Sequence, residues 1–563
     1  MSQKKNVAGV SAGTSAGAST RSAAKSKKKI IEIYDTSLRD GLQGEKVKLN
    51  LRDKLVAVEA LDKLGVDYIE GGFPLASENE SEFFKKVRSL SLKNSKIAAF
   101  GSTRKAGGRA KTDGHIKALL QAESPVVTVV GKSWTKHVTD VIQTTLKENL
   151  QMIEDSVSFL KDQGREVIYD AEHFFDGFHS DREYTLKTIK TAQQAGADRI
   201  VLCDTNGGTT YRRFWEALEA VKDIEGMNFG VHLHDDTGCG VANSMMALDY
   251  GAMHIQGTVN GWGERCGNAN LIVILANLTL KTDYTTKRPD CLKHLTYVSR
   301  LFDDLANLPH NNKQAYTGKS AFAHKAGQHA DVILKNSMLM EHIDAKQVGN
   351  NRRVLLSELA GKATVSHKME RFGNFDKSSK EVAFLTKLLK DKEQEGYEYE
   401  SAEASFQLLI RKHLSAYKEF FKLIDYGITI EKSNPEFYPD ATEDLVRAFV
   451  RVSVDGRESA GVSHGSGPVA ALDNALRKAL IEKYPFIDKI RLADYKVRVL
   501  NAEDASEAKV SVHVTSICRE EKLNLGSWTT VGISANIIDA SWQAITEAFE
   551  YAFNEKADIL KKK

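Results

Sequence analysis

The chain has 563 residues, of which 42% are hydrophobic and 27% are charged, a composition typical of soluble globular proteins with several domains. Its 78 basic and 75 acidic residues leave a net charge of +3, which gives no indication of a nucleic-acid-binding surface. The longest apolar runs, such as residues 126–130, are far too short to span a bilayer, so we expect no membrane segment. The five cysteines show no C-x-x-C spacing, which is typical of reduced thiols and favours the cytoplasm.

Residues 1–28 are rich in Ser, Ala, Gly and Lys, contain no acidic residue and have almost no large apolar side chain. Such a segment cannot bury enough apolar surface to fold, so we expect a disordered tail. The lack of acidic residues also resembles an organelle transit peptide, but the single arginine and the absence of an amphipathic apolar face argue against that alternative. The sequence leaves the question of targeting open.

Eight apolar runs follow the tail, and each precedes a segment of helical periodicity. They cover residues 30–34, 68–69, 97–100, 126–130, 167–169, 200–203, 231–234 and 254–259. Eight such units within residues 29–282 predict an α/β fold, a (β/α)8 TIM barrel, whose functional groups gather at the C-terminal ends of the strands. A doubly wound open sheet is the alternative, but no G-x-G-x-x-G follows the first run.

Two histidines, His232 and His234, lie two residues apart in the seventh run, so both imidazoles project from the same face of a strand. Such a pair can form half of a divalent-metal site, although packing or surface roles are commoner. The neighbouring strand ends are also polar, and they contribute Asp40 and Asn268. Four oxygen and nitrogen donors without a thiolate predict a site for Mg, Mn or Zn with open positions for a chelating oxygen substrate.

Several of these segments resemble a known family. D-T-S-L-R-D-G-L-Q at 35–43, H-L-H at 232–234 and G-E-R-C-G-N at 263–268 resemble the metal-dependent acyltransferase barrels that include the 2-isopropylmalate, homocitrate and citramalate synthases. The resemblance covers almost the whole chain after the tail. It is greatest to the long-form (R)-citramalate synthases, through residues 69–74, 99–104, 131–134, 169–176 and 202–208. Leu42, where isopropylmalate synthases usually carry glutamate, and Asp235, where many relatives carry asparagine, depart from the pattern and blur the substrate inference.

The resemblance implies an acyltransferase that condenses acetyl-CoA with pyruvate to give (R)-citramalate and CoA in isoleucine biosynthesis. The metal would bind Asp40, His232, His234 and Asn268 and polarise the keto group of pyruvate. Arg39 would stabilise the developing oxyanion, and Glu172 would orient or protonate the reacting group. The substrate-binding residues would be Arg39, Gln43 and Thr205. A structural ion pair that only organises the barrel mouth is the alternative for Arg39 and Glu172.

Residues 283–432 resemble the linker subdomains of the family. His329 occupies the family's G-x-H position, where a histidine of one subunit is expected to reach the barrel of the other and act as general base on acetyl-CoA. This arrangement implies a homodimer. His324 is the fallback candidate for the base.

Residues 433–563 show alternating strand patterns at 448–454, 495–500 and 509–514 and two related helices. Five apolar positions recur in these helices at a constant offset of 69: Ala471, Ala475, Leu476, Ala479 and Leu480 match Ala540, Ala544, Ile545, Ala548 and Phe549. The repeat predicts a duplicated α+β unit with one helix in each half. It resembles the family's regulatory amino-acid-binding domain and implies feedback inhibition by isoleucine, whose carboxylate would meet glycine-containing turns at 465–467 and 532–534. A dimerisation module is the alternative.

Two other functions remain open. The first is the same condensation on a longer 2-oxo acid, as in isopropylmalate or homocitrate synthesis. The sequence does not exclude it, because one methylene of the substrate changes the free energy of binding in a hydrophobic pocket by only about 1 to 3 kcal/mol. The other possibility is a non-catalytic amino-acid sensor that keeps the barrel as a scaffold.

Overall fold

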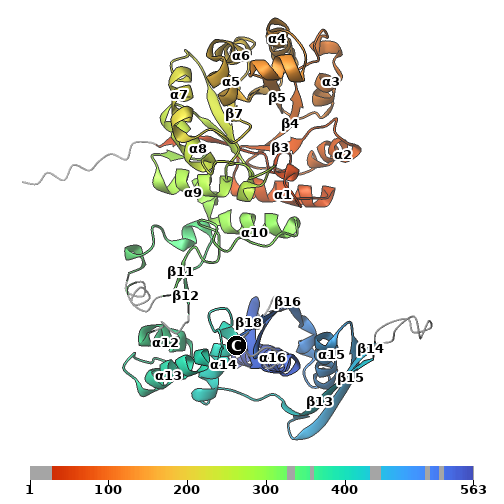
Figure 1. Cartoon of the computed structure of the whole chain (residues 1–563), viewed down its shortest axis with the longest axis vertical. Helices are drawn as coiled ribbons and strands as arrows, with labels where there is room; N and C mark the ends of the chain where they lie inside the picture. The colour runs from red at the N-terminus through yellow and green to blue at the C-terminus, as the bar shows by residue number, and fades with distance from the viewer. Residues whose placement is uncertain are drawn as a thin grey trace, which may run out of the picture. The chain divides into compact units, whose positions relative to one another are not determined.

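The computed structural model describes residues 28–325, 332, 336–355, 361–431, 445–500, 508–518 and 525–561 (Figure 1). The expected tail lies outside these residues except for its last position. The chain forms two compact units, one of residues 1–318 and 346–350 and the other of residues 319–345 and 351–563. Within the described segments, no helix is long and apolar enough to cross a membrane.

The first unit contains a closed barrel of eight parallel strands surrounded by helices, which confirms the predicted TIM barrel (Figure 1). The first and last barrel strands pair in parallel, with Ile33 opposite Ile255. Because the strands are buried on both faces, their sequences are continuous apolar runs rather than alternating ones. The strands are β2 (Glu32–Asp35), β3 (Tyr68–Gly72), β4 (Lys96–Ser102), β5 (Val126–Lys132), β6 (Glu166–Glu172), β7 (Arg199–Asp204), β8 (Phe229–Leu233) and β9 (His254–Gly257).

Helices follow the strands in alternation, and several begin with a side-chain cap. The Asn50 side chain accepts a hydrogen bond from the Asp53 amide, and Thr145 accepts one from the Glu148 amide, so each satisfies an amide that the first helical turn leaves unpaired. The helices of this unit are α1 (Leu51–Leu64), α2 (Glu78–Val87), α3 (Gly114–Gln121), α4 (Leu146–Asp162), α5 (Phe174–Ser180), α6 (Arg182–Gln194), α7 (Tyr211–Val221), α8 (Gly240–Asp249), α9 (Leu271–Lys281) and α10 (Leu295–Leu305). A two-stranded pair, β1 (Lys29–Ile30) and β10 (Tyr284–Thr285), lies outside the barrel.

The second unit ends in two similar halves, each a three-stranded antiparallel sheet with one long helix. One half contains β13 (Lys422–Glu431), β14 (Leu445–Val454), β15 (Arg457–Gly465) and α15 (Pro468–Leu480); the other contains β16 (Ile490–Val499), β17 (Val510–Cys518), β18 (Ser527–Ser534) and α16 (Ile537–Lys561). All ten repeated apolar positions are buried, in a core shared with the strands. The predicted duplication of a sheet and a helix is therefore present. The first sheet begins at Lys422, and the domain boundaries expected from the sequence remain a proposal.

One predicted turn of this region is wrong. Residues 532–534 lie within β18, where Gly532 pairs with Val512. A Cβ added at Gly532 would lie 2.1 Å from the carbonyl oxygen of Ala540. The glycine is therefore needed because α16 packs closely on the strand, and not because the chain turns there.

The rest of the second unit is a small helical subdomain. It contains the short strands β11 (Ala323–His324) and β12 (Arg353–Val354) and the helices α12 (Lys362–Met369), α13 (Lys380–Gln394) and α14 (Glu403–His413). The three helices bury a common apolar cluster that includes Val365, Leu385 and Phe406. His329 lies outside the described residues.

Candidate metal centre and substrate cavity

The predicted metal residues come from three places at the C-terminal end of the barrel. His232 lies in β8 and His234 directly follows this strand, while Asp40 precedes the short helix η1 (Gly41–Gln43) after β2. Asn268 lies between β9 and α9 and pairs with His234 through an isolated bridge. All four side chains belong to buried residues. Barrel closure thus brings together residues that are far apart in the sequence.

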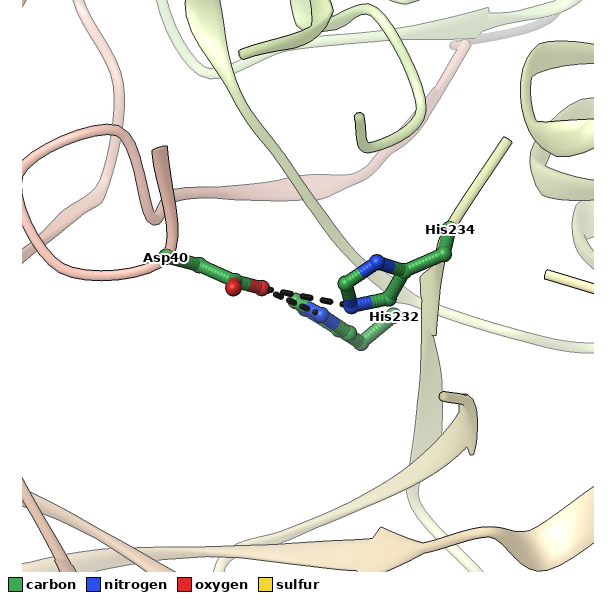
Figure 2. A group of neighbouring side chains, drawn as sticks. All are labelled: Asp40, His232 and His234. Atoms are coloured by element: carbon green, nitrogen blue, oxygen red, sulfur yellow. Dashed lines mark ion pairs between the residues drawn. The ribbon is translucent and has the colours of Figure 1, made fainter. Parts of the chain in front are cut away.

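The Asp40 carboxylate faces both imidazoles (Figure 2). Asp40 Oδ2 lies 3.0 Å from His232 Nε2 and 3.5 Å from His234 Nε2. The three groups can offer one ligand atom each to a common ion. Two imidazole nitrogens and a carboxylate oxygen are donors that Mn²⁺ and Zn²⁺ accept readily.

Two oxygen atoms of this centre are buried but lack a hydrogen-bond donor. Neither Asp40 Oδ2 nor Asn268 Oδ1 accepts a hydrogen bond within the described part of the chain. The Asn268 amide nitrogen donates to the carbonyl oxygen of Trp262 at 3.1 Å, which leaves its oxygen free to coordinate. An unpaired buried oxygen costs about 1 to 3 kcal/mol, and a divalent cation removes this cost by accepting its lone pair. The residues present therefore fit a metal.

The second ring nitrogen of each histidine has its own neighbour. His232 Nδ1 lies 3.0 Å from Gln256 Oε1, and His234 Nδ1 lies 3.3 Å from an amino group of Arg265. A metal on His234 Nε2 would leave a proton on Nδ1. Arg265 also contacts Asp236, at 2.8 Å.

The charges around Asp40 keep it ionised. Burial alone would raise the pKa of the Asp40 carboxyl, but the positive charge of the Arg39 guanidinium is the largest of the effects that outweigh burial and hold the pKa well below its ordinary value. In contrast, burial and the nearby Glu70 carboxylate raise the pKa of Asp170 to about 8. Two carboxyl groups of the cavity lining thus have pKa values shifted in opposite directions.

Arg39 is held rigidly beside the metal residues. Its Nε donates to Glu70 Oε2 at 2.6 Å, and its guanidinium lies 4.0 Å from the centre of the Phe100 ring. Glu70 is fully buried and also accepts a hydrogen bond from the Tyr34 hydroxyl at 2.9 Å. Burial disfavours the charged form of Arg39, yet Glu70 and Asp40 raise its pKa above the ordinary value. This fixed guanidinium can meet a developing negative charge without reorganisation.

Arg39 and Glu172 do not pair with each other: Arg39 contacts Glu70 and Asp40, whereas Glu172 contacts Lys132. The Thr205 hydroxyl accepts a hydrogen bond from the His173 amide at 2.9 Å. A cavity of about 300 Å³ connects these groups, and its lining includes Arg39, Gln43, Glu172, Thr205, His232 and His234.

The fallback base lies in the second unit and is paired there. His324 Nε2 lies 3.1 Å from Glu341 Oε1, and Arg352 binds both oxygens of the same carboxylate at 2.7 and 2.6 Å. Glu341 is buried, so this cluster holds its members in fixed positions.

Three family models match successive parts of the chain. Residues 30–300 match the HMGL-like family, residues 316–396 the homocitrate synthase post-HMGL domain-like family, and residues 400–553 the LeuA allosteric (dimerisation) domain. The (R)-citramalate synthase of Aquifex aeolicus is 44% identical to this chain, over 92% of this chain and 97% of its own length. The (R)-citramalate synthase of Synechocystis sp. is 43% identical, over 93% of this chain and 96% of its own length. A 2-isopropylmalate synthase of Shewanella frigidimarina is 28% identical over 92% of this chain and 95% of its own. This protein has the barrel fold and the barrel-end residues described above, and it is similar to these enzymes over nearly its full length. It therefore belongs to the (R)-citramalate synthase family of acyltransferases.

Proposed function

We propose that this protein condenses acetyl-CoA with pyruvate to form (R)-citramalate and CoA. The observation that carries the proposal is the convergence of Asp40 with both histidines at one end of a cavity, beside the fixed guanidinium of Arg39. Because the citramalate synthases are much more similar to this chain than the isopropylmalate synthase is, pyruvate is favoured over longer 2-oxo acids.

Asp40, His232, His234 and Asn268 would hold the divalent cation, Mg, Mn or Zn. When bound, the cation supplies Lewis acidity for a chelating 2-oxo acid. The two orphaned oxygen atoms of Asp40 and Asn268 support this ligand set.

Arg39 would stabilise negative charge as it develops on oxygen during the condensation. Glu70 and Phe100 support this role because they fix the guanidinium in place. Gln43 and Thr205 would bind the 2-oxo acid together with Arg39. Glu172, at the edge of the same cavity, would orient or protonate the reacting group.

The proton of the acetyl group would be removed by His329 of a second subunit in a homodimer. The match of residues 400–553 to a dimerisation domain supports the dimer. His324 is the less favoured base because Glu341 already engages its Nε2.

Isoleucine would inhibit the enzyme through the C-terminal domain, since citramalate leads towards isoleucine in the family. The match to the LeuA allosteric domain supports this regulation. Inhibition requires that isoleucine favour one arrangement of the chain by a coupling of about 1 to 3 kcal/mol. Activity assays with isoleucine, leucine and lysine test it, and inhibition by leucine alone would favour isopropylmalate synthesis.

The decisive experiment measures free CoA thiol released from acetyl-CoA with pyruvate, 2-oxobutyrate, 2-oxoisovalerate or 2-oxoglutarate. We expect the highest kcat/KM with pyruvate. Preference for 2-oxoisovalerate or 2-oxoglutarate would instead indicate isopropylmalate or homocitrate synthesis. No thiol release with any 2-oxo acid would indicate a non-catalytic sensor.

A further inference from the structure

A second cluster of metal-ligating side chains lies near the barrel mouth. It consists of His137, Glu172 and His173, which we call the His137 cluster. One potential ligand atom from each residue lies within 4.8 Å of those from the other two. Glu172 ends β6, His173 follows it, and His137 begins η3 (His137–Val141) after β5. The cluster shares no residue with the Asp40 centre.

His137 carries a ring nitrogen without a hydrogen-bond partner among the described residues. This atom, Nδ1, is buried. The ring packs against two others: its centre lies 5.1 Å from that of Trp134, which stacks on it, and 4.2 Å from that of His173. A buried imidazole nitrogen without a partner loses hydrogen-bond energy, and a metal ion would restore it.

His173 is oriented in the way that metal-binding histidines usually are. Its Nδ1 lies 2.9 Å from Asp176 Oδ2, and the same carboxylate oxygen accepts a hydrogen bond from Asn206 Nδ2 at 3.0 Å. A carboxylate on one ring nitrogen fixes the tautomer and leaves the other nitrogen, Nε2, free to coordinate. The hydrogen-bonded partners that usually orient a metal-binding histidine are therefore present around His173.

The backbone at both histidines is irregular. Residues 137–141 form a single π-helical turn, a feature that often marks functional sites. His173 has φ 53° and ψ 37°, a left-handed conformation that residues with a Cβ rarely adopt. The two irregular segments place the His173 and His137 rings side by side, with centres 4.2 Å apart.

Two imidazoles and one glutamate match the donor set of a His₂Glu zinc site. Lys132 contacts Glu172 Oε2, which leaves Oε1 for an ion but adds a positive charge nearby. That charge disfavours weakly bound Mg²⁺, whereas Zn²⁺ binds imidazole far more strongly. We propose that the His137 cluster is a second metal site, selective for Zn²⁺ and similar nitrogen-preferring divalent cations, and that its occupation inhibits the enzyme.

The inhibition follows from the position of Glu172, and this part rests on the proposed function. Glu172 lines the cavity that also holds Arg39 and the Asp40 centre. An ion bound by His137 and His173 would immobilise the Glu172 carboxylate and place a positive charge at the cavity edge. The site therefore couples the enzyme to the concentration of free zinc.

Binding is tested on the full chain, stripped of metal and then saturated with Mg²⁺. We expect equilibrium dialysis against Zn²⁺ to show one more bound equivalent in the wild type than in His137→Ala, whether or not zinc also replaces Mg²⁺ at the Asp40 centre. Asp176→Asn should weaken the same equivalent by about 10- to 100-fold. His179→Ala is the matched control, since His179 lies on α5 outside the cluster and its Nε2 meets the backbone carbonyl of Arg213 at 3.1 Å. Equal zinc stoichiometry in the wild type, His137→Ala and Asp176→Asn would overturn the site.

Inhibition is tested by the thiol assay at saturating Mg²⁺ with increasing Zn²⁺, each variant being compared with its own zinc-free rate. The zinc concentration for half inhibition should rise at least about 10-fold in His137→Ala and stay unchanged in His179→Ala. Unchanged inhibition in His137→Ala would refute the inhibitory role. A wild type without any zinc-free activity would instead contradict the proposed function, while the dialysis result would still decide whether the metal site exists.

Discussion

Gln256 fixes the orientation of His232. Its side-chain oxygen lies 3.0 Å from His232 Nδ1, and its amide nitrogen lies 3.3 Å from Asp170 Oδ1. Because the amide nitrogen is engaged by Asp170, its oxygen faces the imidazole, so His232 carries its proton on Nδ1. The unprotonated Nε2 then faces the Asp40 carboxylate, an arrangement of two lone pairs that a cation stabilises.

Gln256→Leu should therefore weaken metal binding by about 10- to 100-fold, because His232 loses the acceptor that fixes its tautomer. Titration with Mn²⁺, followed by electron paramagnetic resonance, measures the dissociation constant. Gln256→Glu keeps an acceptor and should bind more tightly than the leucine variant. Equal affinities of the wild type and Gln256→Leu would show that Gln256 only fills the barrel.

His234→Ala should lose most bound metal and essentially all condensation, because it removes a proposed ligand. The fold should survive, since one open catalytic ion contributes little to a large barrel. Metal analysis, the thiol assay and circular dichroism measure the three properties. His115→Ala, which removes a histidine elsewhere in the barrel, is the control. Full occupancy and activity in His234→Ala would exclude this ligand set.

Arg39→Lys should lower kcat by about 10²- to 10³-fold and retain the metal. A lysine cannot bind Glu70 and also present several fixed donors to the developing oxyanion. Arg199→Lys is the matched control, because Arg199 forms a similar pair with Glu32, at 2.7 Å, but at the opposite end of the barrel strands. If both variants lose activity equally, Arg39 acts through stability alone.

His329→Ala should retain metal and bind pyruvate but lose about 10²- to 10⁴-fold in kcat, the usual effect of removing a general base. Deuterium exchange into the methyl group of acetyl-CoA measures the affected step. Mixed with Arg39→Ala, the variant should regain some activity if each site uses two chains. Failure of subunit exchange to restore activity would place the base in its own subunit, and His324→Ala then tests the alternative base.

The pH dependence of stability should reflect Glu550 in α16. Burial, only partly offset by the Tyr417 hydroxyl, raises its pKa from 4.5 to about 7. The folded chain therefore binds this proton more tightly than the unfolded chain, so stability falls as pH rises from about 4.5 to 7, by up to about 3 kcal/mol. Glu550→Gln should remove this contribution. Calorimetric melting at pH 5 and pH 7.5 measures it, with the exposed Glu482→Gln as control; parallel pH profiles for wild type and Glu550→Gln would contradict it.

The sequence was sufficient to predict the barrel because each strand and helix has its own local period. All eight apolar runs became strands, since a parallel sheet covered by helices requires continuous apolar segments. The C-terminal sheets were harder to predict. β15 was missed because it is largely exposed and few apolar positions mark it. β13 was missed because it lies within the residues that the sequence assigned to the linker subdomains. β18 was missed because its glycine, Gly532, looked like a turn.

The candidate site was predictable only where its residues form short motifs, as in H-L-H at 232–234. Glu70, Gln256 and His137 carry no such signal: each is one polar residue in or after a strand. Their roles come from neighbours that lie far away in the sequence. Glu70 binds Arg39, and Gln256 contacts His232. The His137 ring packs against His173. Local sequence thus determined the elements and the ligand motif, whereas barrel closure decided which side chains meet, because pairing of β9 with β2 brings distant strand ends to one cavity.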